Sequence, residues 1–261
     1  MIIDTHIHLD GTEFDADRDD VIARARAAGV GKMFVPAIDL PTSRAAIDLS
    51  RRYLRYVYPM AGLHPEEVKD GYKDTIRAVE RMMTSEVIAV GEVGLDFYWS
   101  RDNEREQLEA FEEQVCIAVG RGLPLMIHCR KAQNELTAIL RRYEKALHGG
   151  VFHCFTGNAT EAAELLRFDG FALGIGGVLT FKKSKLPDVL PHIPLSRVVL
   201  ETDSPYMAPV PMRGKRNESA FLPFVVAKMS ESYGVPTDEI ERVTTDNARR
   251  IFNVQDDDER V

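Results

Sequence analysis

The feature that most constrains the fold of this chain is a regular alternation of short apolar runs with longer amphipathic stretches. The runs are rich in β-branched and aromatic residues, which is typical of buried strands, and the stretches between them carry apolar residues at helical spacing. Eight runs occur in order, at residues 2–8, 32–38, 57–63, 87–93, 124–129, 151–155, 171–175 and 197–202. Eight strands alternating with helices in 261 residues predict an α/β chain folded as a single (β/α)8 TIM-type barrel.

The stretches between the runs predict helices. The segment 18–29 ends at Gly29, a residue suited to the end of a helix, and a long amphipathic segment starts near Asn103. The last helical pattern covers residues 238–252, and we expect it to be broken by a capping turn at Thr245 or Asp246.

The domain organisation predicted from these patterns is simple. Residues 1–254 form one domain, without a linker, and residues 255–261 form an acidic tail that we expect to be disordered. A doubly wound open sheet is the other architecture considered, but the first run is not followed by the glycine-rich turn of a dinucleotide site.

Composition limits the cellular setting and the class of function. The three cysteines form no CxxC pair, so we expect a reducing cytoplasm and no disulfide framework. The sequence has no apolar run of membrane-spanning length and no signal-peptide pattern at its start. The net charge of −8 argues against a broad, non-specific nucleic-acid binder but leaves room for a local basic site.

The first run ends in the sequence DTHIHLD, which places His6 and His8 two residues apart. Side chains at positions i and i+2 point to the same side of a strand, so both imidazoles would project from one face of the first strand. They could be half of a metal site or a pair of surface histidines on an edge strand. The positions of other ligand-type residues in the chain distinguish these two possibilities.

Further ligand-type side chains follow other predicted strands. The ends of the third, fourth, fifth, sixth and eighth runs carry, respectively, His64, Glu92, His128, His153 and Asp203. In a TIM barrel the C-terminal ends of all strands meet on one rim, where the chemistry takes place. Imidazole nitrogens with carboxylates suit divalent ions such as Zn²⁺ and Mn²⁺, and with enough oxygen and water also Mg²⁺.

Six ligands are too many for one catalytic ion, but they suit two divalent ions about 3.5–4 Å apart that share a carboxylate. Glu92 is the natural bridge. We expect the first ion to bind His6, His8, Glu92 and Asp203, and the second to bind Glu92, His128 and His153. Asp203 could also deprotonate the attacking water. His64 is predicted to lie outside the ligand set, where it could orient substrate, donate a proton or be purely structural.

At these residues the sequence resembles the TatD family of metal-dependent deoxyribonucleases, part of the amidohydrolase superfamily. The matching stretches are DTHIHLD, GLHPE, GEVGLDFYW, IHCRKA, FHCFTG, LGIGG, ETDSPY, RGKRNE and NARRIF. The resemblance implies a TIM-like barrel, dependence on divalent metal and hydrolysis of DNA phosphodiester bonds, often from the 3′ end. It carries the family's metal residues over to the six positions named above, without a departure. Since the fourth strand offers Glu92, a carbamylated-lysine bridge is not expected.

Basic residues cluster after the late strands and favour an anionic substrate. Arg130 follows His128, Lys182, Lys183 and Lys185 follow the seventh run, and Arg213, Lys215 and Arg216 follow Asp203. We predict that Arg130 and the last three bind substrate phosphates. Trp99, the only tryptophan, lies after the fourth run beside Phe97 and Tyr98, where one ring could stack on a base or pack the loop.

Three functions stay open from the sequence. The favoured one is a two-metal deoxyribonuclease that acts on DNA ends in the 3′-to-5′ direction, with DNA as substrate and no organic cofactor. The second is a hydrolase of the same fold that acts on a carboxyl ester, lactone or amide, such as the ester of an aminoacyl-tRNA. The third is a metal-binding protein without catalytic activity, against which the intact ligand set argues.

Overall fold

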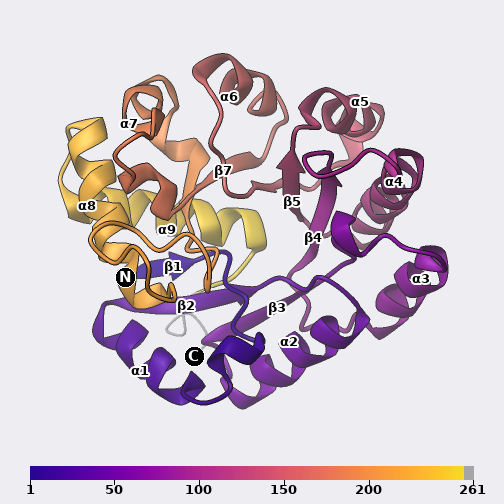
Figure 1. The fold of residues 1–261 in the computed structure, drawn as a ribbon, viewed down its shortest axis with the longest axis horizontal. Helices are drawn as coiled ribbons and strands as arrows, with labels where there is room; N and C mark the ends of the chain where they lie inside the picture. The colour runs from indigo at the N-terminus through magenta and orange to yellow at the C-terminus, as the bar shows by residue number, and fades with distance from the viewer. Residues whose placement is uncertain (256–261) are drawn as a thin grey trace.

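The computed structural model describes residues 1–255 and forms a barrel of parallel strands surrounded by helices (Figure 1). The strands pair in sequence order from β1 to β8, which confirms the predicted (β/α)8 barrel. Their bounds are β1 Ile2–Asp4, β2 Val30–Val35, β3 Val57–Ala61, β4 Ala89–Asp96, β5 Leu125–Arg130, β6 Gly150–Phe152, β7 Phe171–Ile175 and β8 Val198–Leu200.

The α-helices lie between and after these strands. Their bounds are α1 Arg18–Ala27, α2 Leu40–Arg52, α3 Tyr72–Met82, α4 Glu104–Arg121, α5 Gln133–Tyr143, α6 Ala159–Leu165, α7 Leu186–Val189, α8 Leu222–Tyr233 and α9 Thr237–Phe252. Within residues 1–255, no helix has the length and apolar composition needed to cross a membrane. From residue 256 on, the tail predicted at 255–261 lies outside the described residues.

The barrel closes where the segments after β1 and β8 run side by side. Thr5 donates its backbone N–H to the carbonyl of Leu200, and His8 donates to that of Ser204. The prediction that the first strand extends to His8 is wrong, since β1 ends at Asp4. At the strand end Oδ1 of Asp4 accepts the backbone N–H groups of His6 at 3.3 Å and of Thr202 at 3.0 Å, so these N–H groups are not paired between strands.

Helix α9 covers the end of the barrel at which the strands begin. Its residues Ala248, Ile251 and Phe252 pack in one buried cluster with Ile3, Phe34 and other interior strand residues. The break expected at Thr245 or Asp246 is wrong, because α9 is continuous from Thr237 to Phe252. The Thr245 hydroxyl donates to the carbonyl of Met1, so it ties the helix to the chain start and leaves the helical backbone intact.

Candidate metal centre

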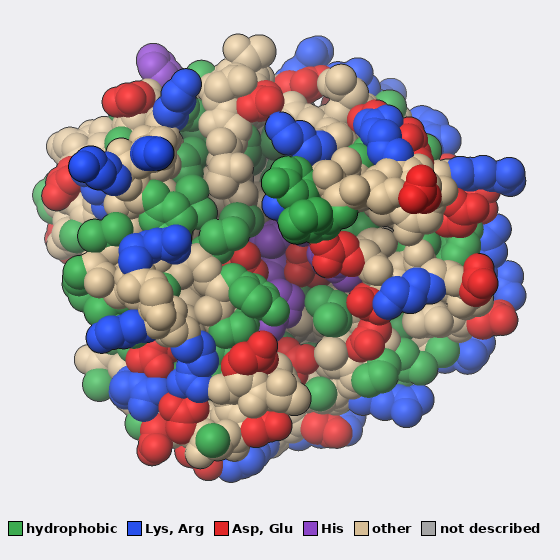
Figure 2. Space-filling model, in the orientation of Figure 1, with side chains coloured by type: hydrophobic (Ala, Val, Ile, Leu, Met, Phe, Trp, Pro, Cys, Tyr) green, Lys and Arg blue, Asp and Glu red, His purple; other side chains and the backbone are tan. Residues whose placement is uncertain are grey.

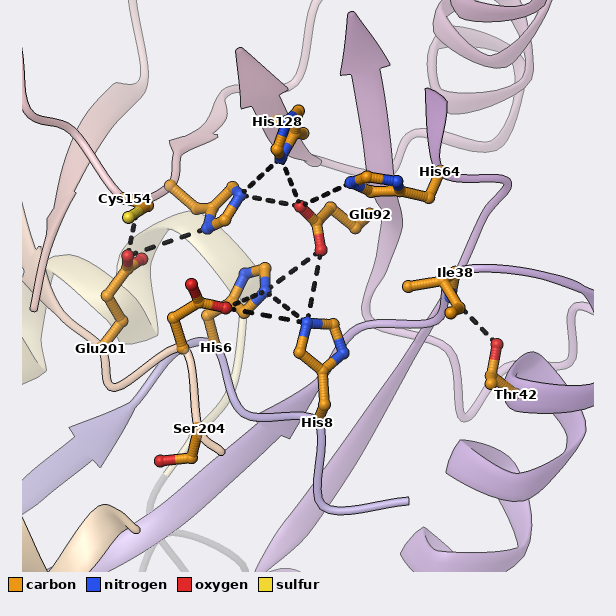
Figure 3. A network of polar contacts seen from close by, with 12 residues as sticks. His6, His8, Ile38, Thr42, His64, Glu92, His128, Cys154, Glu201 and Ser204 are labelled. Atoms are coloured by element: carbon orange, nitrogen blue, oxygen red, sulfur yellow. Dashed lines mark hydrogen bonds and ion pairs between the residues drawn. The ribbon is translucent and has the colours of Figure 1, made fainter. Parts of the chain in front are cut away.

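The imidazoles of His6 and His8 meet at the C-terminal mouth of the barrel. The chain after β1 runs extended between its neighbours, because Ile7 donates its backbone N–H to Phe34 and forms a bridge with Ser204. In an extended chain, side chains two residues apart share a side. The Nε2 atoms of the two rings lie 3.3 Å apart, and both face Glu92 (Figure 3).

Glu92 lies at the centre of the site, and its two carboxylate oxygens face different histidines. Oε2 lies 3.2 Å from Nε2 of His6 and 3.6 Å from Nε2 of His8. Oε1 lies 3.0 Å from Nδ1 of His128 and 2.7 Å from Nε2 of His153. A carboxylate that faces two pairs of nitrogens in this way has the arrangement of a bridging ligand.

The backbone of β4 explains why Glu92 points inward. The pairing of β4 with β5 is irregular between Val90 and Val93. There Glu92 donates its N–H to Ala37, in the chain beyond β2, at 2.8 Å. Gly94 has a φ of +151°, and a Cβ at this position would lie 1.8 Å from the carbonyl oxygen of His128. Only glycine therefore lets β4 approach the backbone that carries this histidine.

A buried carboxylate behind His128 orients its ring. Nε2 of His128 lies 2.9 Å from Oδ2 of Asp96, and Nδ1 of the same ring lies toward Glu92 and His153. Because Asp96 can only accept, the proton belongs on Nε2 and the lone pair of Nδ1 points into the site. A metal-binding histidine usually donates the N–H of its other ring nitrogen to such a carboxylate.

The His64 ring is oriented opposite to that of His128, with its protonated nitrogen toward the site. Its Nδ1 accepts the backbone N–H of Glu66 at 3.2 Å, so a neutral ring carries its proton on Nε2. That Nε2 lies 3.4 Å from Oε1 of Glu92. Although His64, Glu92 and His128 lie close enough to hold a metal ion, a protonated Nε2 is a donor and has no lone pair for one.

Asp203 follows β8 in the left-handed region of backbone conformation, which Asp adopts more readily than most residues other than glycine. Its φ is +55°, and its N–H donates to the carbonyl of His6 at 2.9 Å. Oδ1 lies 3.8 Å from Nε2 of both His6 and His8. This backbone turn directs the Asp203 carboxylate toward the two imidazoles.

The electrostatics of the metal-free cluster favour an ionised Glu92 with a neutral His6 and a positively charged His153. Burial lowers the pKa of His6 to about 3, so this ring is an uncharged donor of a lone pair. Burial opposes ionisation of Glu92, but the histidines around it outweigh this and hold its pKa well below the usual range. Burial by itself would lower the pKa of His153, but the negative charge of Glu92 outweighs burial and raises this pKa to about 10. The buried carboxylate therefore attracts positive charge to this position.

Two features indicate that the cluster fits metal ions. Nδ1 of His6 and Nδ1 of His153 are buried without a hydrogen-bond partner, while their Nε2 atoms converge on Glu92. Several imidazoles packed around an ionised carboxylate form a suitable donor set for Zn²⁺ or Mn²⁺, because a bound cation can replace the proton that Glu92 attracts to His153. His6, His8 and Asp203 form one group of the right spacing.

The structure also brings in two carboxylates that the sequence reasoning missed. Glu201 is fully buried, and burial raises its pKa to about 8. Its Oε1 accepts the N–H of Cys154 at 2.6 Å and lies 3.8 Å from Nδ1 of His153. Asp96 is the other. Glu201 precedes Asp203 by two residues and Asp96 follows Glu92 by four, so a search for acidic residues at even spacing from the predicted ligands would have found both.

The cluster lies at the floor of a cavity of about 430 Å³. Figure 2 shows histidines in a hollow on this face of the molecule. Acidic side chains dominate the described lining: Asp10, Glu13, Glu66, Glu67, Glu92, Asp96 and Asp203. Among these described lining residues, Arg130 is the only one with a basic side chain of the lysine or arginine type. The cavity therefore needs added positive charge before it can attract an anion.

The other predicted phosphate-binding residues lie outside the described lining of this cavity. Arg216 donates to both carboxylate oxygens of Asp17 at 2.8 Å, which compensates its charge. The Arg213 guanidinium lies 4.0 Å from the centre of the Phe181 ring. Lys215 is exposed. Arg130 is therefore the predicted residue that the structure brings nearest to the metal cluster.

Comparison with known proteins decides the family. A family model described as "TatD related DNase" matches residues 3–253. The chain belongs to the TatD DNase family. It is 36% identical over 256 residues to the uncharacterized metal-dependent hydrolase YabD of Bacillus subtilis, covering 97% of this chain and 100% of YabD. It is 34% identical over 260 residues to the 3′-5′ ssDNA/RNA exonuclease TatD of Erwinia amylovora, covering 97% and 100%.

A solved structure agrees with these relatives. The TatD homologue YjjV of Escherichia coli K12 superposes with a TM-score of 0.91 at 31% identity, over 97% of this chain and 98% of YjjV. The TatD resemblance predicted from the sequence is thus confirmed, together with the barrel. Family and donor set together make the chain a metal-dependent hydrolase of the TatD family.

Proposed function

We propose that this TatD-family chain is a phosphodiesterase that removes nucleotides from the 3′ end of single-stranded nucleic acid, with DNA as the expected substrate, and uses two divalent ions. The observation that carries the proposal is the position of Glu92, whose two oxygens face His6 and His8 on one side and His128 and His153 on the other. Relatives named as 3′-5′ ssDNA/RNA exonucleases support the choice of substrate and direction.

The donor set divides naturally between two positions. His6, His8 and Asp203 would hold one ion, His128 and His153 the other, and Glu92 would serve both. Two bound ions neutralise a phosphate and stabilise the charge that develops on the attacking and leaving oxygens of a phosphodiester. They would also offset the acidic lining of the cavity.

One side chain would move a proton during hydrolysis, and a second would orient the substrate. Asp203, beside His6 and His8, would accept a proton from the water whose oxygen attacks phosphorus. His64 presents its Nε2–H toward the site and would donate a hydrogen bond to the oxygen that leaves when the bond between phosphorus and that oxygen breaks, while solvent water protonates that oxygen. Arg130 would bind the phosphate from the rim, and Arg213, Lys215 and Arg216 would contact phosphates farther along the strand.

The acidic lining favours one second candidate. Glu13, Glu66 and Glu67 would attract an ammonium group, such as that of an aminoacyl ester on the end of a tRNA. Hydrolysis of that carboxyl ester would use the same metal centre. A lactone or a neutral amide gains nothing from these carboxylates.

A substrate and metal screen on purified protein tests both functions. Protein stripped of metal is reloaded with Mg²⁺, Mn²⁺ or Zn²⁺ and assayed on 5′- and 3′-labelled single strands, on duplexes and on aminoacyl-tRNA. The nuclease proposal expects stepwise shortening from the 3′ end, absent in Glu92→Gln. Release of the amino acid without shortening of any strand would replace it by the second candidate.

A further inference from the structure

The loop after β4 presents two aromatic rings to solvent beside the metal cluster. The exposed fraction of Trp99 is 74% and that of Tyr98 is 48%, while Phe97 is buried. The rings of Tyr98 and Trp99 meet edge to face, with centroids 4.8 Å apart. Figure 2 shows hydrophobic side chains at the border of the hollow that contains the histidines. Exposed aromatic surface at the edge of a site is a mark of ligand binding.

The base of this loop is fixed to the metal centre. Phe97 donates its N–H to the carbonyl of Arg130 at 2.9 Å, and Tyr98 donates its N–H to Oδ1 of Asp96 at 2.8 Å. Asp96 is the residue that orients His128. These hydrogen bonds hold the backbone of Phe97 and Tyr98 beside the metal residues, and the Trp99 ring contacts the Tyr98 ring.

Arg130 links the rings to the cavity. Its guanidinium lies 3.7 Å from the centre of the Tyr98 ring and 5.5 Å from that of Trp99, and the same side chain lines the cavity. Stacking on an aromatic face holds the planar cation while its N–H groups stay available to a phosphate. A base-binding surface and a phosphate donor thus lie side by side.

We propose that Tyr98, Trp99 and Arg130 form an aromatic platform that binds an unpaired nucleobase next to the phosphodiester to be cut. The proposal rests on the proposed nuclease function. In a duplex both faces of every internal base are covered by its neighbours, so a base inside the strand must be unstacked before it can lie on Trp99. The platform would select single strands, with little preference among bases, because every base has a π-face.

The first test is a cycle of substrate and protein changes. The substrates are a single-stranded oligonucleotide and the same strand with abasic sites at its last positions. The proteins are wild type, Trp99→Ala and Trp99→Phe, with Leu54→Ala as control, because Leu54 is 75% exposed and precedes β3 at the other end of the barrel. Removing the base should raise KM roughly tenfold in wild type. It should do the same in Trp99→Phe and the control, and have almost no effect in Trp99→Ala.

The second test reads binding without turnover. Trp99 is the only tryptophan, so its emission reports this position alone. A phosphorothioate oligothymidylate should quench it in the metal-loaded protein, and the abasic strand should not.

These tests separate the two proposals. A wild type that cleaves no strand with any ion overturns the nuclease function. If wild type cleaves both substrates with equal KM, or if Trp99→Ala responds to the abasic strand as wild type does, the platform alone is overturned. Equal quenching by both strands would also overturn it, since the backbone would then be the ligand.

Discussion

Asp96 and His128 share a contact of 2.9 Å between Oδ2 and Nε2, on the side of the ring away from Glu92. Their hydrogen bond fixes which nitrogen of His128 can bind a metal. Oδ1 of Asp96 meanwhile accepts the N–H of Tyr98, so one carboxylate serves both the metal centre and the aromatic loop.

Asp96→Asn should weaken metal binding although Asp96 is not predicted to be a ligand. The asparagine can keep its oxygen toward Tyr98, but its amide group then faces Nε2 of His128 and favours a proton on Nδ1. We expect about 10- to 100-fold weaker metal affinity, measured by competition with a chelator. An unchanged affinity would show that the tautomer of His128 is set elsewhere.

Glu92→Gln should reduce the number of ions bound. An amide offers one weak oxygen where the carboxylate offers two, and it lacks the charge that attracts cations to the histidines. Wild type reconstituted with excess Mn²⁺ or Zn²⁺ should bind two ions per chain, and Glu92→Gln one or none. Elemental analysis after dialysis measures both, and a single ion in saturated wild type would contradict the bridging role.

Asp203→Asn should lower turnover far more than it lowers stability. It removes the proposed proton acceptor, a role that contributes about 10²- to 10⁴-fold to rate. Since burial raises the pKa of Asp203, the ionised carboxyl is not a source of stability in the metal-free protein. Its thermal midpoint should therefore match wild type or exceed it. Near wild-type cleavage by Asp203→Asn would refute the assigned role.

The Asp17–Arg216 pair should make stability depend on pH in acid. The hydrogen bond from Arg216 lowers the pKa of Asp17 to about 2, from an ordinary value of 3.8. A carboxyl with a depressed folded-state pKa contributes stability above about pH 4 and loses it as the pH falls toward 2. Asp17→Asn should thus be less stable than wild type at pH 7, by less than about 1 kcal/mol because water screens this part-exposed pair. In urea unfolding, a stability gap that stays constant from pH 7 to pH 3 and below would contradict this account.

Substitutions of the basic residues should separate substrate contacts from structural ones. Arg130→Ala, Arg213→Ala and Lys215→Ala should each raise KM for DNA and flatten its salt dependence by roughly one unit or less. Arg216→Ala should do this and also destabilise the fold, because it breaks the pair with Asp17. KM measured against salt concentration, beside urea unfolding, distinguishes the residues. A variant that changes neither quantity carries a solvated side chain.

Much of this protein could be read from its sequence. Runs of β-branched residues between amphipathic stretches specify strands and helices locally, and eight such units without a glycine-rich dinucleotide turn favour a barrel over a doubly wound open sheet. Because that barrel gathers all strand ends on one rim, residues as distant as His6 and Asp203 could be expected to meet. The strand ends were less predictable: β1 stops at Asp4, whose carboxylate accepts the backbone N–H of Thr202, a residue 198 positions later.

Only the tertiary structure decided which atoms face one another. No local pattern tells that Oε1 and Oε2 of Glu92 face separate histidine pairs, or that the backbone of Glu66 leaves a proton on Nε2 of His64. Arg216 is predicted to contact phosphate from its place in the sequence, and only the fold shows that its guanidinium also binds Asp17, just before α1. Residue type and spacing determine which chemistry a chain can offer. The distances and hydrogen-bond partners that direct this chemistry arise from contacts between segments far apart in the chain, and these exist only in the folded barrel.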